Sequence, residues 1–145
     1  MIVVGVDPDS VRHGLAIFSD GHLVALESRN LVEIRKWLDG CDSEIMFSIE
    51  NVLANNFVYS RNVQQTKAAT AKVAIGIGRC QQAQEELMRE LDDRQIPYIL
   101  HKPSGMNWAK DKARFERTTG WPGKSNEDTR SAAYFGWLAV KGELK

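Results

Sequence analysis

The sequence contains only two cysteines, Cys41 and Cys80, and their spacing matches neither a disulfide framework nor a zinc-binding motif. Low cysteine usage is typical of proteins from a reducing compartment. No apolar run approaches the ~20 residues that a transmembrane helix needs, and no signal peptide precedes the first apolar segment. We therefore expect a cytoplasmic protein, located in the host cytoplasm if its genome is viral.

A net charge is also lacking, because 19 Lys and Arg residues balance 19 Asp and Glu residues. This balance argues against indiscriminate binding of nucleic acid. The charges are unevenly distributed, however. Residues 51–84 carry four basic residues and no acidic one, and residues 101–130 carry seven basic residues against four acidic ones. Local positive regions of this kind favour a polyanionic substrate.

No repeat, linker or low-complexity tract divides the 145 residues, so we expect one domain covering residues 1–145. Aliphatic runs predict strands, and apolar residues at helical spacing predict helices. The expected strands cover 2–7, 13–19, 22–28, 45–50 and 96–100, and the expected helices cover 31–38, 64–94, 104–118 and 125–141. This order predicts an α/β sandwich in which three antiparallel strands lead into parallel ones, with helices on the faces.

Several local signals support these elements. Asp20-Gly21 predicts a tight hairpin turn, and Asn30 and Gly40 are placed to cap and to end the first helix. Gly76 and Gly78 each weaken the long helix by about 1 kcal/mol, so we expect them to permit close packing against the sheet or a partner. The predicted apolar side of that helix consists of Ala68, Ala71, Ile75, Ile77, Cys80, Ala83, Leu87 and Leu91.

Carboxylates close two of the predicted strands. Asp7 follows the apolar run 2–6, Glu50 ends the fourth strand, and Glu127 and Asp128 open the last helix. A carboxylate at the end of a buried strand loses its water, which costs several kcal/mol unless a cation or hydrogen-bond donors replace it. Acidic residues on three separate elements therefore predict a metal-dependent active site.

Each of these acids also has a purely structural interpretation. Asp7 precedes the turn-forming Pro8-Asp9-Ser10, and a slip of the strand would put Glu50 on a solvated face. The sequence 125–128 fits a capping box, with acids at the positive end of the helix dipole.

Helical phase separates the two acids of the last helix. Asp128 shares a stripe with Ala132, Phe135 and Ala139, whereas Glu127 aligns with Ser131. We therefore favour Asp128 and keep Glu127 in reserve.

The chain resembles the ribonuclease H-like superfamily, and within it the RuvC-type Holliday junction resolvases, from residue 2 to about residue 140. The matching segments are Gly5-Val6-Asp7-Pro8-Asp9-Ser10, Gly14-Leu15-Ala16, Ile49-Glu50-Asn51, the long helix with small residues, and the basic segment from His101. The resemblance implies a ribonuclease H-like α/β fold: a five-stranded mixed sheet, its first three strands antiparallel, with helices on both faces.

Two positions depart from the family pattern. The last helix of the family carries two acids three residues apart, and here Asp128 is followed by Ser131. The family also places an aromatic residue three positions after the glutamate, where this chain has Leu53. Phe57 and Tyr59 are the available substitutes for that aromatic residue.

The resemblance implies two Mg²⁺ ions per site, with Mn²⁺ able to substitute, for phosphodiester hydrolysis. Asp7 would bridge the ions, with Glu50 holding one and Asp128 the other, and Ser131 and His101 would lie near these ligands. The expected contacts to DNA come from basic and aromatic side chains. They are Lys102, Lys110, Lys112, Lys124, Arg61, Phe57 and Tyr59.

The predicted function is that of an endonuclease resolving four-way (Holliday) DNA junctions by paired symmetric nicks in recombination and repair. Two symmetric nicks require two sites related by a twofold axis, so we expect a homodimer formed through the long helix. The alternatives are a nuclease on other branched DNA or on RNA–DNA hybrids, and a catalytically silent junction-binding protein, suggested by Ser131. An actin-like nucleotide-binding protein would need a second glycine-rich phosphate loop, which the sequence lacks.

Overall fold

The computed structural model describes residues 1–54 and 67–143. These residues contain one five-stranded sheet with the strand order β3-β2-β1-β4-β5. The strands are β1 Ile2–Asp7, β2 His13–Ser19, β3 His22–Arg29, β4 Ile45–Glu50 and β5 Tyr98–His101. β2 is antiparallel to both β1 and β3, whereas β4 is parallel to both β1 and β5. The expected mixed sheet, with its first three strands antiparallel, is confirmed.

The sequence of β1 explains its central place in the sheet. Its apolar run is uninterrupted, and Val3 packs into the core on one face while Val4 and Val6 pack into the core on the other. A continuous apolar run is typical of a strand that is covered on both faces. At the β2–β3 turn, Asp20 and Gly21 have φ angles of 49° and 83°. Two successive positive φ angles suit the twist of a tight hairpin, so the predicted turn is confirmed.

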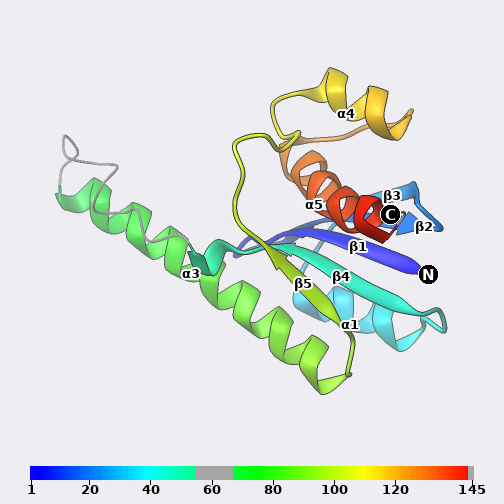
Figure 1. Cartoon of the computed structure of the whole chain (residues 1–145). Helices are drawn as coiled ribbons and strands as arrows, with labels where there is room; N and C mark the ends of the chain where they lie inside the picture. Colours follow the sequence, from blue (N-terminus) through cyan, green and yellow to red (C-terminus); the bar gives the residue numbers. More distant parts are fainter. Residues whose placement is uncertain (55–66, 144–145) are drawn as a thin grey trace.

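One face of the sheet is covered by α1, Leu31–Asp39, and by the second half of α3, Lys67–Asp93 (Figure 1). The Asn30 side chain accepts a hydrogen bond from the Glu33 N–H at 2.9 Å, and the Glu33 side chain accepts one from the Asn30 N–H at 3.1 Å. This capping box begins α1, and Gly40 ends it as expected. The core beneath these helices consists of Val4, Val6, Leu15, Ile34, Leu38, Ile45, Phe47, Ile49, Leu87 and Leu91.

The opposite face is covered by α5, Glu127–Glu143, with α4, Lys112–Thr119, lying beyond it (Figure 1). Glycines allow α5 to approach the sheet closely: a Cβ on Gly5 would overlap the carbonyl oxygen of Ala132, and a Cβ on Gly136 would stand 2.7 Å from the Phe18 ring. The core on this face consists of Val3, Ala16, Phe18, Trp108, Phe115, Ala132, Ala133, Ala139 and Val140. The expectation of helices on both faces is therefore confirmed.

The long helix differs from its prediction. Among its described residues, burial is confined to the C-terminal half, at Gln84, Leu87 and Leu91. Ala68, Ala71 and Ile75, which were predicted on its apolar side, are exposed, and the first half of α3 extends past the edge of the sheet in Figure 1. Outside the α3 backbone, no described residue stands within 4 Å of the Cβ positions of Gly76 and Gly78. The prediction that these glycines pack against the sheet is therefore wrong, and their packing against a partner stays a prediction.

In the last third of the chain, three boundaries of helices and strands differ from the predicted ones. Residues 102–111 form turns and bends rather than helix, and α4 begins only after the Asp111 side chain accepts from the Arg114 N–H at 3.1 Å. β5 covers Tyr98–His101 instead of 96–100.

The N-terminal cap of α5 also differs from its prediction. The cap is Asn126, whose side chain accepts from the Thr129 N–H at 2.9 Å, so the capping box predicted for 125–128 is shifted by one residue. None of the described helices combines the length and the apolar character that a membrane crossing requires.

Candidate active site

Asp7 and Glu50 lie at the same edge of the sheet. Val6 of β1 pairs with Ile49 of β4 in a parallel ladder, and the two carboxylates are the next residues of their strands. Because parallel neighbours end on the same side of a sheet, the fold brings these side chains together. Both are half-buried.

Asp128 reaches the same edge from the first turn of α5. Asp7 pairs with Gly14 of β2, and a Cβ on Gly14 would stand 2.7 Å from the carbonyl oxygen of Asp128 and 3.1 Å from its Cβ. The start of α5 therefore lies directly on Gly14, beside Asp7. Asp128 and Glu127, one residue earlier, are both exposed.

Negative charge is unfavourable at this edge of the sheet, as the raised pKa values of its three carboxyl groups show. Burial, and then the charge of Glu50, raise the pKa of Asp7 from 3.8 to about 7, with smaller contributions from Asp128 and Asp9. Burial also raises the pKa of Glu50. Partial burial, and then the charges of Asp9 and Glu127, raise the pKa of Asp128. A cation at this edge would relieve the repulsion.

Ser131 touches this group of acids. Its side chain is buried, and its hydroxyl donates a hydrogen bond to the Asp7 carboxylate, which lowers the pKa of Asp7 against the larger effect of burial. The residue that stands in place of the family's fourth acid is thus a hydrogen-bond donor to Asp7.

His101 is the pairing partner of Glu50 across β4 and β5. The Ser48 hydroxyl donates to the carbonyl oxygen of Phe135 at 2.7 Å and lies 2.7 Å from Nε2 of His101. Because that hydroxyl has only one proton, Nε2 of His101 must donate to it. Burial lowers the pKa of His101, so the neutral ring ties β5 to β4 and α5 next to Glu50.

Asp9 is a site residue that the sequence analysis does not identify, because Pro8-Asp9-Ser10 also has the composition of a turn. Its charge raises the pKa of both Asp7 and Asp128. The Asp9 N–H donates to Nδ1 of the buried His13 at 3.2 Å, which holds the turn toward the site. The signal available in the sequence was the position of a second acid two residues after Asp7.

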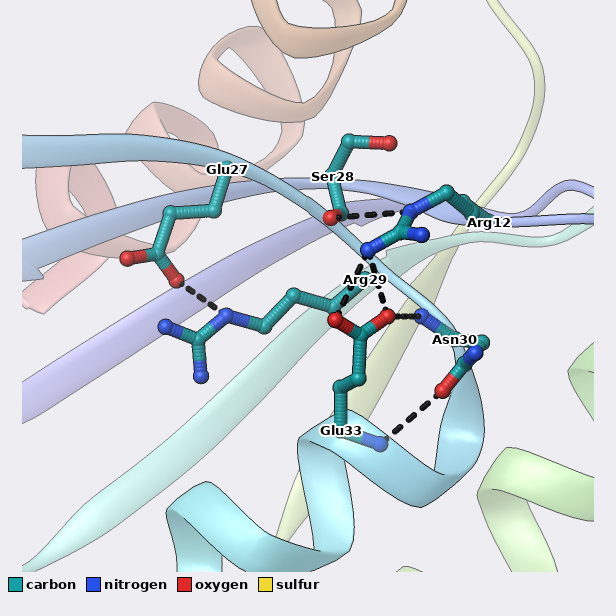
Figure 2. A network of polar contacts seen from close by, with 6 residues as sticks. All are labelled: Arg12, Glu27, Ser28, Arg29, Asn30 and Glu33. Atoms are coloured by element: carbon teal, nitrogen blue, oxygen red, sulfur yellow. Dashed lines mark hydrogen bonds and ion pairs between the residues drawn. The ribbon is translucent and has the colours of Figure 1, made fainter.

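A polar network fixes the other end of this turn to α1 (Figure 2). Nη2 of Arg12 donates to both carboxylate oxygens of Glu33, at 2.5 and 2.7 Å, and Nε of Arg12 donates to the Ser28 carbonyl at 3.2 Å. Figure 2 shows the second ion pair of this region, in which Nε of Arg29 lies 2.6 Å from Oε2 of Glu27. The connection that carries Asp9 is therefore anchored at both ends.

The donor set can be compared with the needs of a metal ion. All the converging donors are carboxylate oxygens, which suits Mg²⁺ or Mn²⁺. Within residues 1–54 and 67–143, however, no three His, Cys, Asp or Glu side chains lie close enough to form a metal-binding group. Mg²⁺ is commonly held by one or two carboxylates together with substrate phosphates and water. The residues fit that mode of binding.

The basic residues predicted to contact DNA are exposed where the structure describes them. These residues are Lys102, Lys110, Lys112 and Lys124. Arg130 of α5 stabilises the segment between them, because Nε and Nη2 donate to the Ala109 carbonyl at 3.0 and 2.8 Å, and Nη1 donates to Ser125 at 3.0 Å. Phe57, Tyr59 and Arg61 lie outside the described residues.

Comparison with known proteins gives a likeness of fold. No protein-family model and no curated protein sequence matches the chain. Among solved structures, Thermus thermophilus RuvC in complex with a Holliday junction substrate matches with a TM-score of 0.64 and 15% identity, covering 99% of this chain and 96% of that one. A second structure of T. thermophilus RuvC matches with a TM-score of 0.60, the same identity and the same coverage. The chain therefore has the RuvC-like, ribonuclease H-like fold.

Proposed function

We propose that the protein is a metal-dependent endonuclease of the crossover junction endodeoxyribonuclease type. In this proposal, residues 1–145 form one nuclease domain that resolves four-way DNA junctions by paired symmetric nicks in recombination and repair. The observation that carries the proposal is the meeting of Asp7 and Glu50 at the ends of parallel strands, with Asp128 held beside them by the contact at Gly14. The likeness in fold to a RuvC that was solved with a Holliday junction supports the choice of substrate.

In the proposed site, Asp7 and Glu50 would hold one Mg²⁺ ion, and Asp7 and Asp128 the other, with Mn²⁺ able to substitute. Bound ions of this kind activate the attacking water and stabilise the leaving 3′ oxygen. Burial makes the anionic form of Asp7 unfavourable in the free protein, so a bound cation would stabilise its carboxylate. The Ser131 hydroxyl keeps that carboxylate oriented, and Glu127 adds negative charge next to Asp128.

The exposed lysines between 102 and 124 would bind the phosphate backbone without regard to sequence. Arg61, Phe57 and Tyr59 are proposed to contact DNA on the strength of the sequence alone. The first half of α3 would join a second copy of the chain, since its apolar residue Ile75 is 56% exposed. A homodimer formed in this way would present two cutting sites.

A catalytically silent junction-binding protein is the second candidate. Two observations favour it: Ser131 occupies the position of the fourth acid, and no three-residue metal-binding group exists among the described side chains. Such a protein would bind a four-way junction with the same affinity in the presence and absence of Mg²⁺ and would leave it uncut.

The deciding experiment uses a synthetic four-way junction, a linear duplex of the same sequence, a three-way junction and an RNA–DNA hybrid, each with Mg²⁺, with Mn²⁺ and with EDTA. We expect metal-dependent, symmetric nicks in the four-way junction, and the Asp7→Asn variant should bind that junction without cutting it. Preferential cutting of another substrate would reassign the specificity. Binding without cutting by the natural sequence, with either metal, would favour the silent protein.

A further inference from the structure

A cavity of about 300 Å³ opens beside the candidate site, between the β1–β2 connection and the exposed half of α3. Two of its lining residues continue the strands that end in the site: Pro8 follows Asp7, and Val52 lies two positions beyond Glu50. The described residues that line it are Pro8, Val52, Val73, Gly76, Ile77 and Cys80. The cavity and the carboxylates therefore share a wall.

The lining is apolar. Among the described lining residues, none has a charged side chain, and the one polar side-chain group, the Cys80 thiol, accepts a hydrogen bond from the Ser10 N–H. Outside the backbone of α3, no described residue stands within 4 Å of the Cβ position of Gly76, so a flat group can approach the helix there. These residues offer no ligand to a phosphate or a metal ion, whereas an apolar ring would bury its face against them.

Cys80 also shows how near the cavity lies to the acids. After burial, the charges of Asp9, Asp7 and Asp128 are among the causes that raise the pKa of its thiol. A group that fills the cavity would therefore lie next to a phosphate bound at Asp7. Residues 51–84 contain no acidic residue, so this wall does not repel a polyanion.

We propose that the cavity receives one unstacked nucleobase of the strand that is cut, next to the scissile phosphate. This inference rests on the proposed function and adds a subsite to it. The apolar lining can contact the flat faces of a base but presents no pattern of hydrogen-bond donors and acceptors. It should therefore accept purines and pyrimidines alike. Removing a base from its stack costs least where pairing is already broken, and the cavity therefore favours branch points over continuous duplex.

The test compares Gly76→Leu with the matched control Gly142→Leu in α5. Both glycines are exposed helix positions, and no described residue outside the local helix backbone stands within 4 Å of either Cβ position. Both substitutions raise helix propensity, so both variants should fold. Gly76 lines the cavity and Gly142 does not. Loss of one stacked base should lower junction cleavage by about tenfold in Gly76→Leu, with little change in Gly142→Leu.

A second readout places 2-aminopurine in the junction, at each nucleotide flanking the mapped cut, with Ca²⁺ replacing Mg²⁺. We expect its fluorescence to rise at one position with the natural protein and with Gly142→Leu, and to stay low with Gly76→Leu. Normal cleavage by Gly76→Leu, or no rise at any position, overturns the inference while leaving the nuclease intact. Loss of the dimer mass in Gly76→Leu alone would assign the cavity to a second copy of the chain. If the natural protein neither binds nor cuts the junction, the proposed function itself has failed, and the subsite with it.

Discussion

Gly14 of β2 supports the backbone of Asp128 at the start of α5, with 2.7 Å between the Cβ position of Gly14 and the carbonyl oxygen of Asp128. Gly14 is also the pairing partner of Asp7. One residue without a side chain therefore sets the distance between a strand carboxylate and a helix carboxylate. If this contact is lengthened, the acids should separate without being removed.

Gly14→Ala should accordingly reduce cleavage much more than it reduces junction binding. The added methyl group pushes α5 away from β2, and overpacking of this kind costs about 1–3 kcal/mol of the free energy of unfolding. Cleavage rates, junction affinity and thermal unfolding would be measured in parallel. Gly142→Ala is the control, because Gly142 lies in α5 and no described residue outside the helix backbone stands within 4 Å of its Cβ position. Equal rates for the two variants would show that the contact does not position Asp128.

Asp7 should make the metal-free protein less stable as the pH rises. Its pKa is raised from 3.8 to about 7 in the folded state, so between these values the folded state binds more protons than the unfolded state. The free energy of unfolding must then fall with rising pH across that window. Asp7→Asn should remove the part of this slope that Asp7 contributes and stabilise the protein at pH 8 in EDTA, by on the order of 4 kcal/mol.

Mg²⁺ provides the control for this prediction. Added at pH 8, it should stabilise the natural protein and leave Asp7→Asn unchanged, as measured by thermal unfolding. If both proteins respond equally to Mg²⁺, the ion binds elsewhere.

The two helix acids should differ in importance. Asp128→Asn should abolish cleavage, because Asp128 interacts with Asp7, whereas Glu127 interacts with Asp128. Glu127→Gln should therefore only weaken cleavage, and both variants should keep their affinity for the junction in EDTA. The measurement is the cleavage rate as a function of Mg²⁺ concentration. The reverse ranking would mean that the helical phase is wrong by one residue.

Ser131→Asp tests the missing fourth acid. The substitution exchanges a hydrogen-bond donor to Asp7 for a second buried carboxylate. Mg²⁺ affinity should rise because charge is added, and stability in EDTA should fall because an unpaired charge is buried. Ser131→Ala is the control, which loses the donor without adding charge. Unchanged Mg²⁺ affinity in Ser131→Asp would place Ser131 outside the reach of a bound ion.

The order of the elements was predictable because the relevant signals are local. The apolar run of β1, the Asp20-Gly21 turn and the Asn30 cap each act within a few residues. The coming together of Asp7 and Glu50 also follows from sequence, because parallel strands end at one edge of a sheet. Each of these inferences needs only the period of a strand and the identity of the residue that closes it.

Contacts between distant elements were not predictable in the same way. Nothing near Gly5 or Gly14 in the sequence indicates that α5 lies on them. By contrast, Gly76 and Gly78, for which close packing is expected, have no described residue outside the α3 backbone within 4 Å of their Cβ positions. The apolar spacing of α3 continues into a half that the sheet does not cover, since periodicity reports an apolar side and not what covers it. Asp9 was overlooked because a turn explains its residue type equally well.

The uncovered half of α3 leads to the last prediction, which concerns assembly. If α3 joins two copies, light scattering should give about twice the 16.3 kDa chain mass with and without DNA. Ile75→Lys should then yield a monomer whose two nicks are no longer coupled, because a charge would be buried in the interface. Val32→Lys in α1 is the matched control, since Val32 and Ile75 are both 56% exposed. A monomer mass for the natural protein at micromolar concentrations, both free and bound to a junction, would rule out the dimer and with it the source of paired nicks.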